Sequence, residues 1–310
     1  NVVIEERRWR TENDQRGALW EALFSTVFWA HPYRNPVIGW RSDLENVSLE
    51  KVKQFYETYY APNNAYLIVV GDVKAEEVFK IAEKYFGKYE SKEIPKFYTT
   101  EPKQRGPRRT EIKKEGFATY IALAYRVPKA SSEYSPAVSL LADILGGGKT
   151  SKLYKSIVYN KQLASSISAF YYGLKDEGLL IIFATLQQGK DINELEKAIN
   201  EEIENLRKNK VSEEELRRAK NSQLANLVYS RESVVRLGFQ LGDALINTEN
   251  PNYINEYPKL IQKVSKQDIE KIINEYINDD NKTTVIVHPI PPSDIQAYIE
   301  GLKKASEIRR

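Results

Sequence analysis

A repeat within the chain constrains its fold more than any other feature. Residues 47–73 align without a gap with residues 264–290, so that each residue lies 217 positions before its counterpart. Five aligned pairs are identical: Val47 and Val264, Ser48 and Ser265, Tyr59 and Tyr276, Asn64 and Asn281, Val70 and Val287. Each copy reads as a capped helix, a turn and a buried strand. The repeat predicts two similar units, although any capped helix leading into a strand shares part of this pattern.

The offset also predicts where the two units begin and end. A polar stretch punctuated by prolines separates the copies, and we expect a linker over residues 97–116. If the second unit starts near Thr110, the start of the first unit falls about a hundred residues before Asn1. We therefore expect residues 1–96 to be the rear half of a first domain and residues 117–310 to be a second domain.

The pattern of apolar residues favours an α+β fold. Helical spacing predicts helices over residues 2–29, with a break at Asn13 and Asp14, and over 48–59, 75–89, 135–145 and most of 192–276, with a short helix at the end of the chain. Short apolar runs predict strands over residues 65–70, 119–127, 166–172, 179–186 and 285–287. Antiparallel strands followed by a run of helices are typical of α+β domains rather than of doubly wound sheets.

Composition removes several classes of function. The chain has no cysteine, which excludes disulfides, thiol nucleophiles and cysteine-bound metals. It has two histidines, His31 and His288, which are too few for a zinc site built from histidine alone within this sequence. The formal net charge is +3 and is spread along the chain, which argues against a nucleic-acid partner. No apolar run reaches the roughly 18 residues that a membrane-spanning helix needs.

Short motifs along the whole chain resemble the M16 metallopeptidases, the family of pitrilysin, insulysin and the mitochondrial processing peptidases. The similarity is to the short bacterial M16B members. In the first unit it rests on VVIEERR (2–8), TEND (11–14), HPY (31–33), PVIG (36–39), YAPNN (60–64) and VVGD (69–72). In the second unit it rests on LGGG (145–148), TSKLY (150–154) and KQLA (161–164). The order and spacing of these motifs carry the resemblance.

The resemblance implies a fold and a metal ion. Members of the family have two similar LuxS/metallohydrolase-like α+β domains that face each other, and the first of them is incomplete in this sequence. They bind Zn²⁺ through a His-x-x-Glu-His helix and through a glutamate about 75 residues later. The register of VVIEE places Glu6 at the position of that glutamate. The sequence contains no His-x-x-Glu-His motif, and we expect the motif upstream of Asn1.

The resemblance assigns one metal ligand to this chain, Glu6. The resemblance assigns no catalytic residue to this chain. Three protein ligands and one open position suit a catalytic Zn²⁺, which lowers the pKa of its bound water to about 7. The alternative explanation is structural. Glu5 and Glu6 lie in the first turns of a predicted helix, where the helix dipole and pairing with Arg7, Arg8 or Arg10 favour carboxylates.

The resemblance also implies a substrate and a partner. Some members, or their partner subunits, carry an Arg and a Tyr that grip the substrate backbone, and this chain has Val158 and Ser165 at those positions. It therefore resembles the zinc-bearing half of a heterodimer whose homologous subunit supplies the pair, with a homodimer as the alternative. The expected function is a zinc metalloendopeptidase subunit acting on extended peptides, unfolded or short, and inactive as this segment alone. A non-catalytic scaffold subunit and a metal-independent peptide-binding subunit are the alternatives.

The remaining polar and glycine-rich features have structural explanations. His31 lies between an apolar helix and a proline turn, and we expect it to cap or pack rather than to bind a metal. His288 ends a strand and is expected at the surface. The three glycines at 146–148 lack the spacing and the Lys-Ser/Thr ending of a phosphate-binding loop, so they predict a break between helices.

Overall fold

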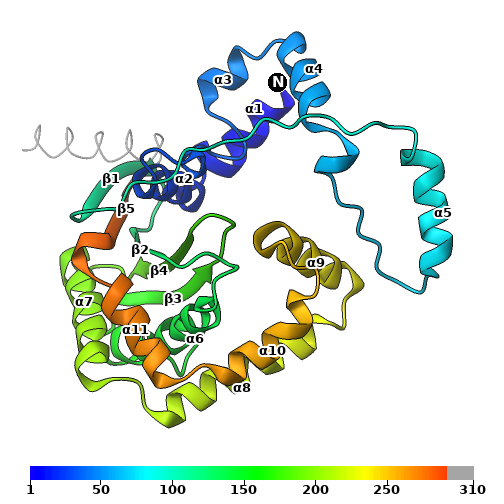
Figure 1. Cartoon of the computed structure of the whole chain (residues 1–310). Helices are drawn as coiled ribbons and strands as arrows, with labels where there is room; N and C mark the ends of the chain where they lie inside the picture. The colour runs from blue at the N-terminus through cyan, green and yellow to red at the C-terminus, as the bar shows by residue number, and fades with distance from the viewer. Residues whose placement is uncertain (292–310) are drawn as a thin grey trace, which may run out of the picture.

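The computed structural model describes residues 1–291, which contain one mixed five-stranded sheet with helices on both faces (Figure 1). The strands are β1 (Arg108–Glu115), β2 (Tyr120–Val127), β3 (Ala164–Tyr172), β4 (Gly178–Leu186) and β5 (Lys282–Ile290). Their order is β1-β5-β2-β4-β3; β1 is parallel to β5, and the other pairs are antiparallel. The α+β prediction is confirmed, and the helix expected at the chain end lies outside the described residues.

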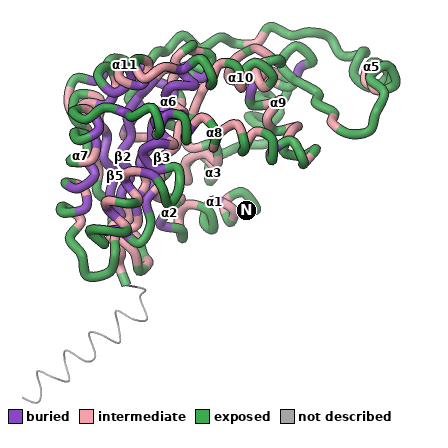
Figure 2. The backbone as a smooth tube through the Cα atoms, turned by 90° about the horizontal axis from the view of Figure 1, so that it is seen from below, coloured by how far each residue is buried: buried purple, intermediate pink, exposed green. Residues whose placement is uncertain are grey.

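Helices of the second unit cover one face of this sheet. They are α6 (Ser135–Gly146), α7 (Ile192–Asn209), α8 (Glu213–Ser230), α10 (Tyr253–Lys263) and α11 (Lys266–Tyr276). Each turns an apolar stripe inward, as in α7, where the buried residues Leu195, Ala198, Ile199, Ile203 and Leu206 recur at helical spacing. Together with one side of β2 and β4 they form the larger hydrophobic core, which is purple in Figure 2.

A helix of the first unit covers the opposite face. This helix is α2 (Gln15–Val27), and its cap is Asp14, whose Oδ2 accepts the Gly17 N–H at 2.6 Å, so the predicted break is confirmed. Its apolar face packs on β2, β4 and β5 in a second core that contains Leu19, Leu23, Val27, Phe28, Ala122, Ala124, Leu179, Ile181, Val285 and Val287. Because both faces of the sheet are covered, β2 and β4 are apolar almost throughout.

The rest of the first unit makes little contact with these cores. It comprises α1 (Val2–Arg7), a π-helical turn η1 (Arg8–Glu12), η2 (Pro32–Arg34), α3 (Arg41–Glu45), α4 (Leu49–Tyr59), η3 (Pro62–Asn64) and α5 (Ala75–Phe86). Neither α4 nor α5 contains a buried residue, and Leu49 and Phe79 are each 70% exposed. In Figure 1, α5 stands apart from the sheet.

The structure repeats with the same offset as the sequence. The bounds of α11 are those of α4 shifted by 217, and η5 (Asp279–Asn281) matches η3 in the same way. Ser48 and Ser265 cap the two helices through their side chains. Asn64 Nδ2 donates to the Tyr59 carbonyl at 2.8 Å, and Asn281 Nδ2 donates to the Tyr276 carbonyl at 2.7 Å. These shared bonds support duplication over a chance match of local pattern.

The strand predicted over residues 65–70 is wrong for this chain. The segment is extended but has no ladder partner among the described residues, and Leu67 is 61% exposed. Its counterpart β5 is buried because it lies between β1 and β2. A strand needs neighbours to satisfy its backbone, and those of the first unit are not within residues 1–291. Residues 108–115, which the sequence placed in the linker, form β1.

The helix α9 (Val234–Thr248) is the counterpart of α2 at the same offset, and it meets the extended segment. A Cβ added to Gly242 would lie 3.3 Å from Ile68 Cδ1, and one added to Gly238 would lie 3.8 Å from Val70 Cγ2. Thus α2 packs against β5 of the second unit, and α9 lies against the β5-like segment of the first.

Candidate functional site

The candidate ligand Glu6 lies on α1, and its side chain is 42% exposed. Its only charged partner among the described residues is Arg10, whose Nε lies 3.1 Å from Glu6 Oε1 and whose side chain is 65% exposed. Glu5 pairs with Arg8 at 2.6 Å. Within residues 1–291 no three His, Asp or Glu side chains are grouped so as to hold a metal ion. The described residues therefore offer one carboxylate and not a complete zinc site.

The counterpart of Glu6 in the second unit is Gln223 on α8, 217 positions later. Gln223 Nε2 donates to Ser139 Oγ on α6 at 2.9 Å, so this face of α8 meets the helix that precedes it in its own unit. By the same relation, Glu6 lies on the face of α1 that would meet the corresponding helix of the first unit. Among the described residues, Glu6 is a carboxylate whose only charged contact is with the exposed Arg10.

Arg7, the next residue, is buried, and it pairs with Glu21 and Glu12 rather than with Glu5 or Glu6, the partners that the sequence offered. Its Nη1 and Nη2 donate to the two carboxylate oxygens of Glu21 at 2.7 and 3.0 Å, and Nη1 also donates to the Gly39 carbonyl at 2.8 Å. Glu12 Oε1 lies 3.3 Å from Arg7 Nε. The hydrogen bond with Glu21 raises the pKa of Arg7 above its usual value. This arginine ties α1 to α2 and to the loop before α3.

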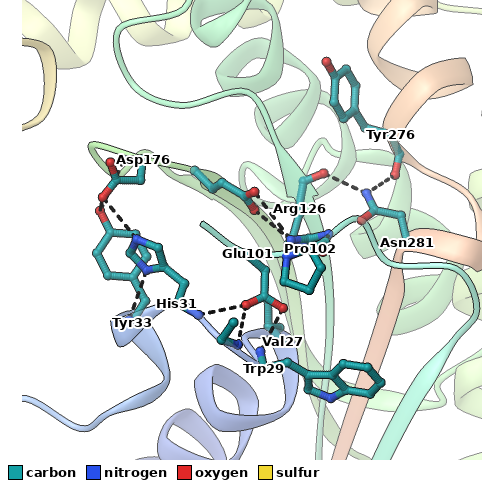
Figure 3. A network of polar contacts seen from close by, with 12 residues as sticks. Val27, Trp29, His31, Tyr33, Glu101, Pro102, Arg126, Asp176, Tyr276 and Asn281 are labelled. Carbon is teal, nitrogen blue, oxygen red and sulfur yellow. Dashed lines mark hydrogen bonds and ion pairs between the residues drawn. The ribbon is translucent and has the colours of Figure 1, made fainter. Parts of the chain in front are cut away.

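A second polar network joins the linker to the two units (Figure 3). The Glu101 carboxylate is fully buried and accepts the backbone N–H groups of Trp29, Ala30 and His31 at 2.8, 2.8 and 3.0 Å. Burial raises the pKa of Glu101, but these three bonds outweigh it and hold the pKa below its usual value. Arg126 Nη2 donates to the Pro102 carbonyl at 2.7 Å. The network anchors the end of α2 to the linker.

Each of the two histidines lies beside a carboxylate from a distant part of the chain. His31 Nδ1 accepts the Tyr33 N–H at 3.2 Å, which confirms the predicted cap, and His31 Nε2 lies 3.3 Å from Asp176 Oδ2. Figure 3 shows Asp176, from the turn between β3 and β4, beside His31 and Tyr33. His288 Nε2 lies 2.8 Å from Glu111 Oε2 on the neighbouring strand, and its side chain is 32% exposed.

The other predicted positions lie in the second unit. Val158 belongs to a π-helical segment, η4 (Tyr154–Asn160), and packs on the larger core, whereas Ser165 is exposed near the start of β3. The predicted glycine break is confirmed, because α6 ends at Gly146. A Cβ on Gly146 would lie 2.1 Å from the Ala169 backbone nitrogen. Glycine is needed there for the close packing of α6 on β3.

A family model described as "Peptidase M16 inactive domain" matches residues 46–223. The matched residues run from just before α4, through the linker, into α8. The chain belongs to the M16 peptidase family. The zinc protease PqqE of Helicobacter pylori is 33% identical over 292 residues, which are 93% of this chain and 66% of that protein. An uncharacterised zinc protease of Mycobacterium leprae, ML0855, is 25% identical over 284 residues, or 90% and 63% of the two chains.

Solved M16 structures share the fold. The crystal structure of a protease from Helicobacter pylori matches with a TM-score of 0.87 and 33% identity, over 93% of this chain and 70% of that one. An M16 inactive domain from Pseudomonas fluorescens matches with a TM-score of 0.81 and 18% identity, over 94% and 69%. This M16 chain thus spans about two thirds of the length of its curated relatives. Among residues 1–291 no helix is both long and apolar enough to cross a membrane.

Proposed function

We propose that this M16 chain is part of a zinc metalloendopeptidase of the M16B type, in which Glu6 is one of three protein ligands to Zn²⁺. The other two ligands and the general base would come from a His-x-x-Glu-His helix outside the 310 residues. The relatives named as zinc proteases support the metal and the reaction class. The observation that carries the role of Glu6 is the bond between its counterpart Gln223 and Ser139, which marks the face of α1 that would meet such a helix.

The chemistry of the site assigns a limited task to this chain. A bound Zn²⁺ supplies a Lewis acid and a water of low pKa for peptide hydrolysis. Glu6 would contribute one negative oxygen ligand, and α1 would hold it in place. The second unit would contribute no carboxylate at the equivalent position, because the counterpart of Glu6 is the amide Gln223. The substrates proposed are extended peptides, either short or unfolded.

Metal binding by the full-length gene product tests this proposal. We expect Glu6→Gln to lose zinc, measured by competition against a chromophoric chelator and by elemental analysis, because the amide oxygen is a neutral and weaker ligand. Glu5→Gln is the matched control, since Glu5 is adjacent, exposed and paired with Arg8 in the same helix. Full zinc occupancy in Glu6→Gln, or equal losses in both variants, would refute the role of Glu6.

A partner subunit belongs to the same proposal. The positions that carry an Arg and a Tyr in other members are Val158 and Ser165 here. The Val158 side chain has no donor, and the Ser165 hydroxyl is on a much shorter side chain than that of tyrosine. We propose that a homologous M16 subunit supplies the pair, with association of two identical chains as the alternative.

The second candidate function is a non-catalytic subunit, either a scaffold or a peptide-binding module without metal. The match to a model described as an inactive domain favours it. A scaffold would retain its fold and its association when Glu6 is changed, and a peptide-binding module would bind extended peptides with no dependence on zinc. Zinc bound by the wild-type protein and lost in Glu6→Gln would exclude both.

A further inference from the structure

The Arg7–Glu21 ion pair is an unusual feature of the first unit. The Arg7 side chain is 6% exposed and that of Glu21 is 19% exposed, and the pair is bidentate. Burying an arginine and a glutamate removes both from water, a cost that their mutual attraction offsets only when the geometry is good. Replacement of such pairs by apolar residues is often neutral or stabilising. Stability alone is therefore a weak reason for this pair.

The second unit solves the same packing problem without charge. The counterparts of Arg7 and Glu21, 217 positions later, are Leu224 on α8 and Gly238 on α9. Leu224 packs against the larger core, and glycine has no side chain to pair with it. The unit that carries the candidate metal ligand thus has a buried, directional contact where the other unit has an apolar one. A function confined to the first unit explains this difference.

The contact determines the orientation of α1 about its own axis. This helix has six residues, too few to be stable alone, and a π-helical turn follows it at once. Arg7 ties it to α2 through Glu21 and to the following loop through the Gly39 carbonyl. Adjacent residues of a helix point about 100° apart, so holding Arg7 also sets the direction of Glu6.

The required precision can be worked out from helix geometry. Side chains extend to about 5–6 Å from a helix axis, so a rotation of about 20° displaces a carboxylate by about 2 Å. Metal–ligand distances vary by only about 0.2 Å in well-formed sites. A single hydrogen bond to a flexible side chain permits such rotation, whereas a bidentate guanidinium–carboxylate pair with an added backbone acceptor opposes it.

We propose that Arg7 is a positioning residue, whose bidentate pair with Glu21 holds the Glu6 carboxylate in the direction of the metal. This inference rests on the proposed function, because it takes Glu6 as a ligand. Arg7 itself touches neither metal nor substrate. Arg7 makes no bond to Glu6 and would act through the backbone of α1. Loss of groups that orient metal ligands typically lowers metal affinity about 10- to 100-fold.

The test replaces the pair by apolar residues like those of the second unit. In the full-length gene product we expect Arg7→Leu combined with Glu21→Ala to keep its thermal midpoint and to bind Zn²⁺ at least tenfold more weakly. We also expect the visible spectrum of the Co²⁺-saturated protein to change, because it reports ligand geometry. The matched control is Lys210→Leu with Glu270→Ala, which removes an ion pair of 2.9 Å between two residues of the second unit. Arg41 is left unchanged, because it pairs with Glu12, which also contacts Arg7.

A milder variant covers the case in which the double variant does not fold. Arg7→Lys keeps the charge but loses the bidentate contact, so we expect a folded protein with weaker zinc binding and an altered Co²⁺ spectrum. Wild-type affinity and spectrum in either folded variant, with zinc lost in Glu6→Gln, would overturn the role of Arg7 and leave the proposed function standing. Zinc retained in Glu6→Gln would refute the proposed function instead.

Discussion

Two leucine substitutions test where the stability of this chain resides. Leu23 is 1% exposed on α2, against the sheet of the second unit, whereas Leu67 is 61% exposed in the extended segment of the first unit. Both belong to the part of the chain assigned to the first domain. The change from leucine to alanine is the same in each, so the difference in cost measures burial alone to a first approximation.

The expected costs follow from the exposed fractions. Leucine to alanine removes three carbon groups, worth about 2.4 kcal/mol when they are fully buried. At Leu23 a cavity between α2 and β2 adds to this, for a total of about 3–4 kcal/mol. At Leu67 only the 39% of the side chain that is buried counts, which gives about 1 kcal/mol and no enclosed cavity.

Urea unfolding of the 310-residue chain, followed by far-UV circular dichroism, measures both values. Equal m-values in the wild type and the two variants would show that the same surface unfolds in each, so the free energies can be compared. A cost at Leu67 equal to or above that at Leu23 would refute the reasoning. It would mean that residues 65–70 are packed in a core of their own.

The buried Glu101 and the half-buried Asp143 should give opposite pH dependences, which thermal unfolding midpoints between pH 3 and pH 8 would measure. The pKa of Glu101 is lowered in the fold, so its contribution is present above its unfolded pKa of about 4.3 and is lost as the pH falls below that; Glu101→Gln should flatten the acid limb. Burial raises the pKa of Asp143 to about 6, so its contribution is lost as the pH rises from about 4 through 6; Asp143→Asn should stabilise the protein at pH 8 relative to pH 4. An acid limb unchanged by Glu101→Gln, or an Asp143→Asn effect independent of pH, would contradict these assignments.

Local patterns predicted most of the second unit, because its neighbours in space are also present in the described chain. The strands predicted over residues 119–127 and 179–186 became β2 and β4 with bounds within one residue. Their apolar runs indicated burial on both faces, which α2 on one side and the second-unit helices on the other supply. The caps of the two repeated helices were predictable because a cap needs only a few adjacent residues.

The error at residues 65–70 has a clear physical cause. Val69 and Val70 have side chains typical of a core strand. A strand also needs a neighbouring strand whose backbone groups pair with its own along at least one edge. The sequence of the segment shows its apolar side chains but does not show whether a neighbouring strand is present. The same segment therefore looks like β5 in sequence and lies exposed in the structure.

The candidate site was found from the sequence only in part. Glu6 was identified by its register in a family motif, while Arg7 and Glu21, fourteen residues apart, carry no signal in a charged helix where arginine and glutamate are common. The buried Glu101 lies in a polar linker and gives even less indication. Pairs of this kind become visible only when the fold brings their elements together.

The sequence by itself determined the α+β class and the 27-residue repeat at an offset of 217, because both depend on the order of side chains along the chain. Resemblance to a family motif selected Glu6 as the candidate ligand. The tertiary structure decided which helices cover which face of the sheet, which extended segment lacks a strand partner, and that Arg7 pairs with Glu21. Those depend on contacts between residues distant in sequence, and burial and pairing in three dimensions select them.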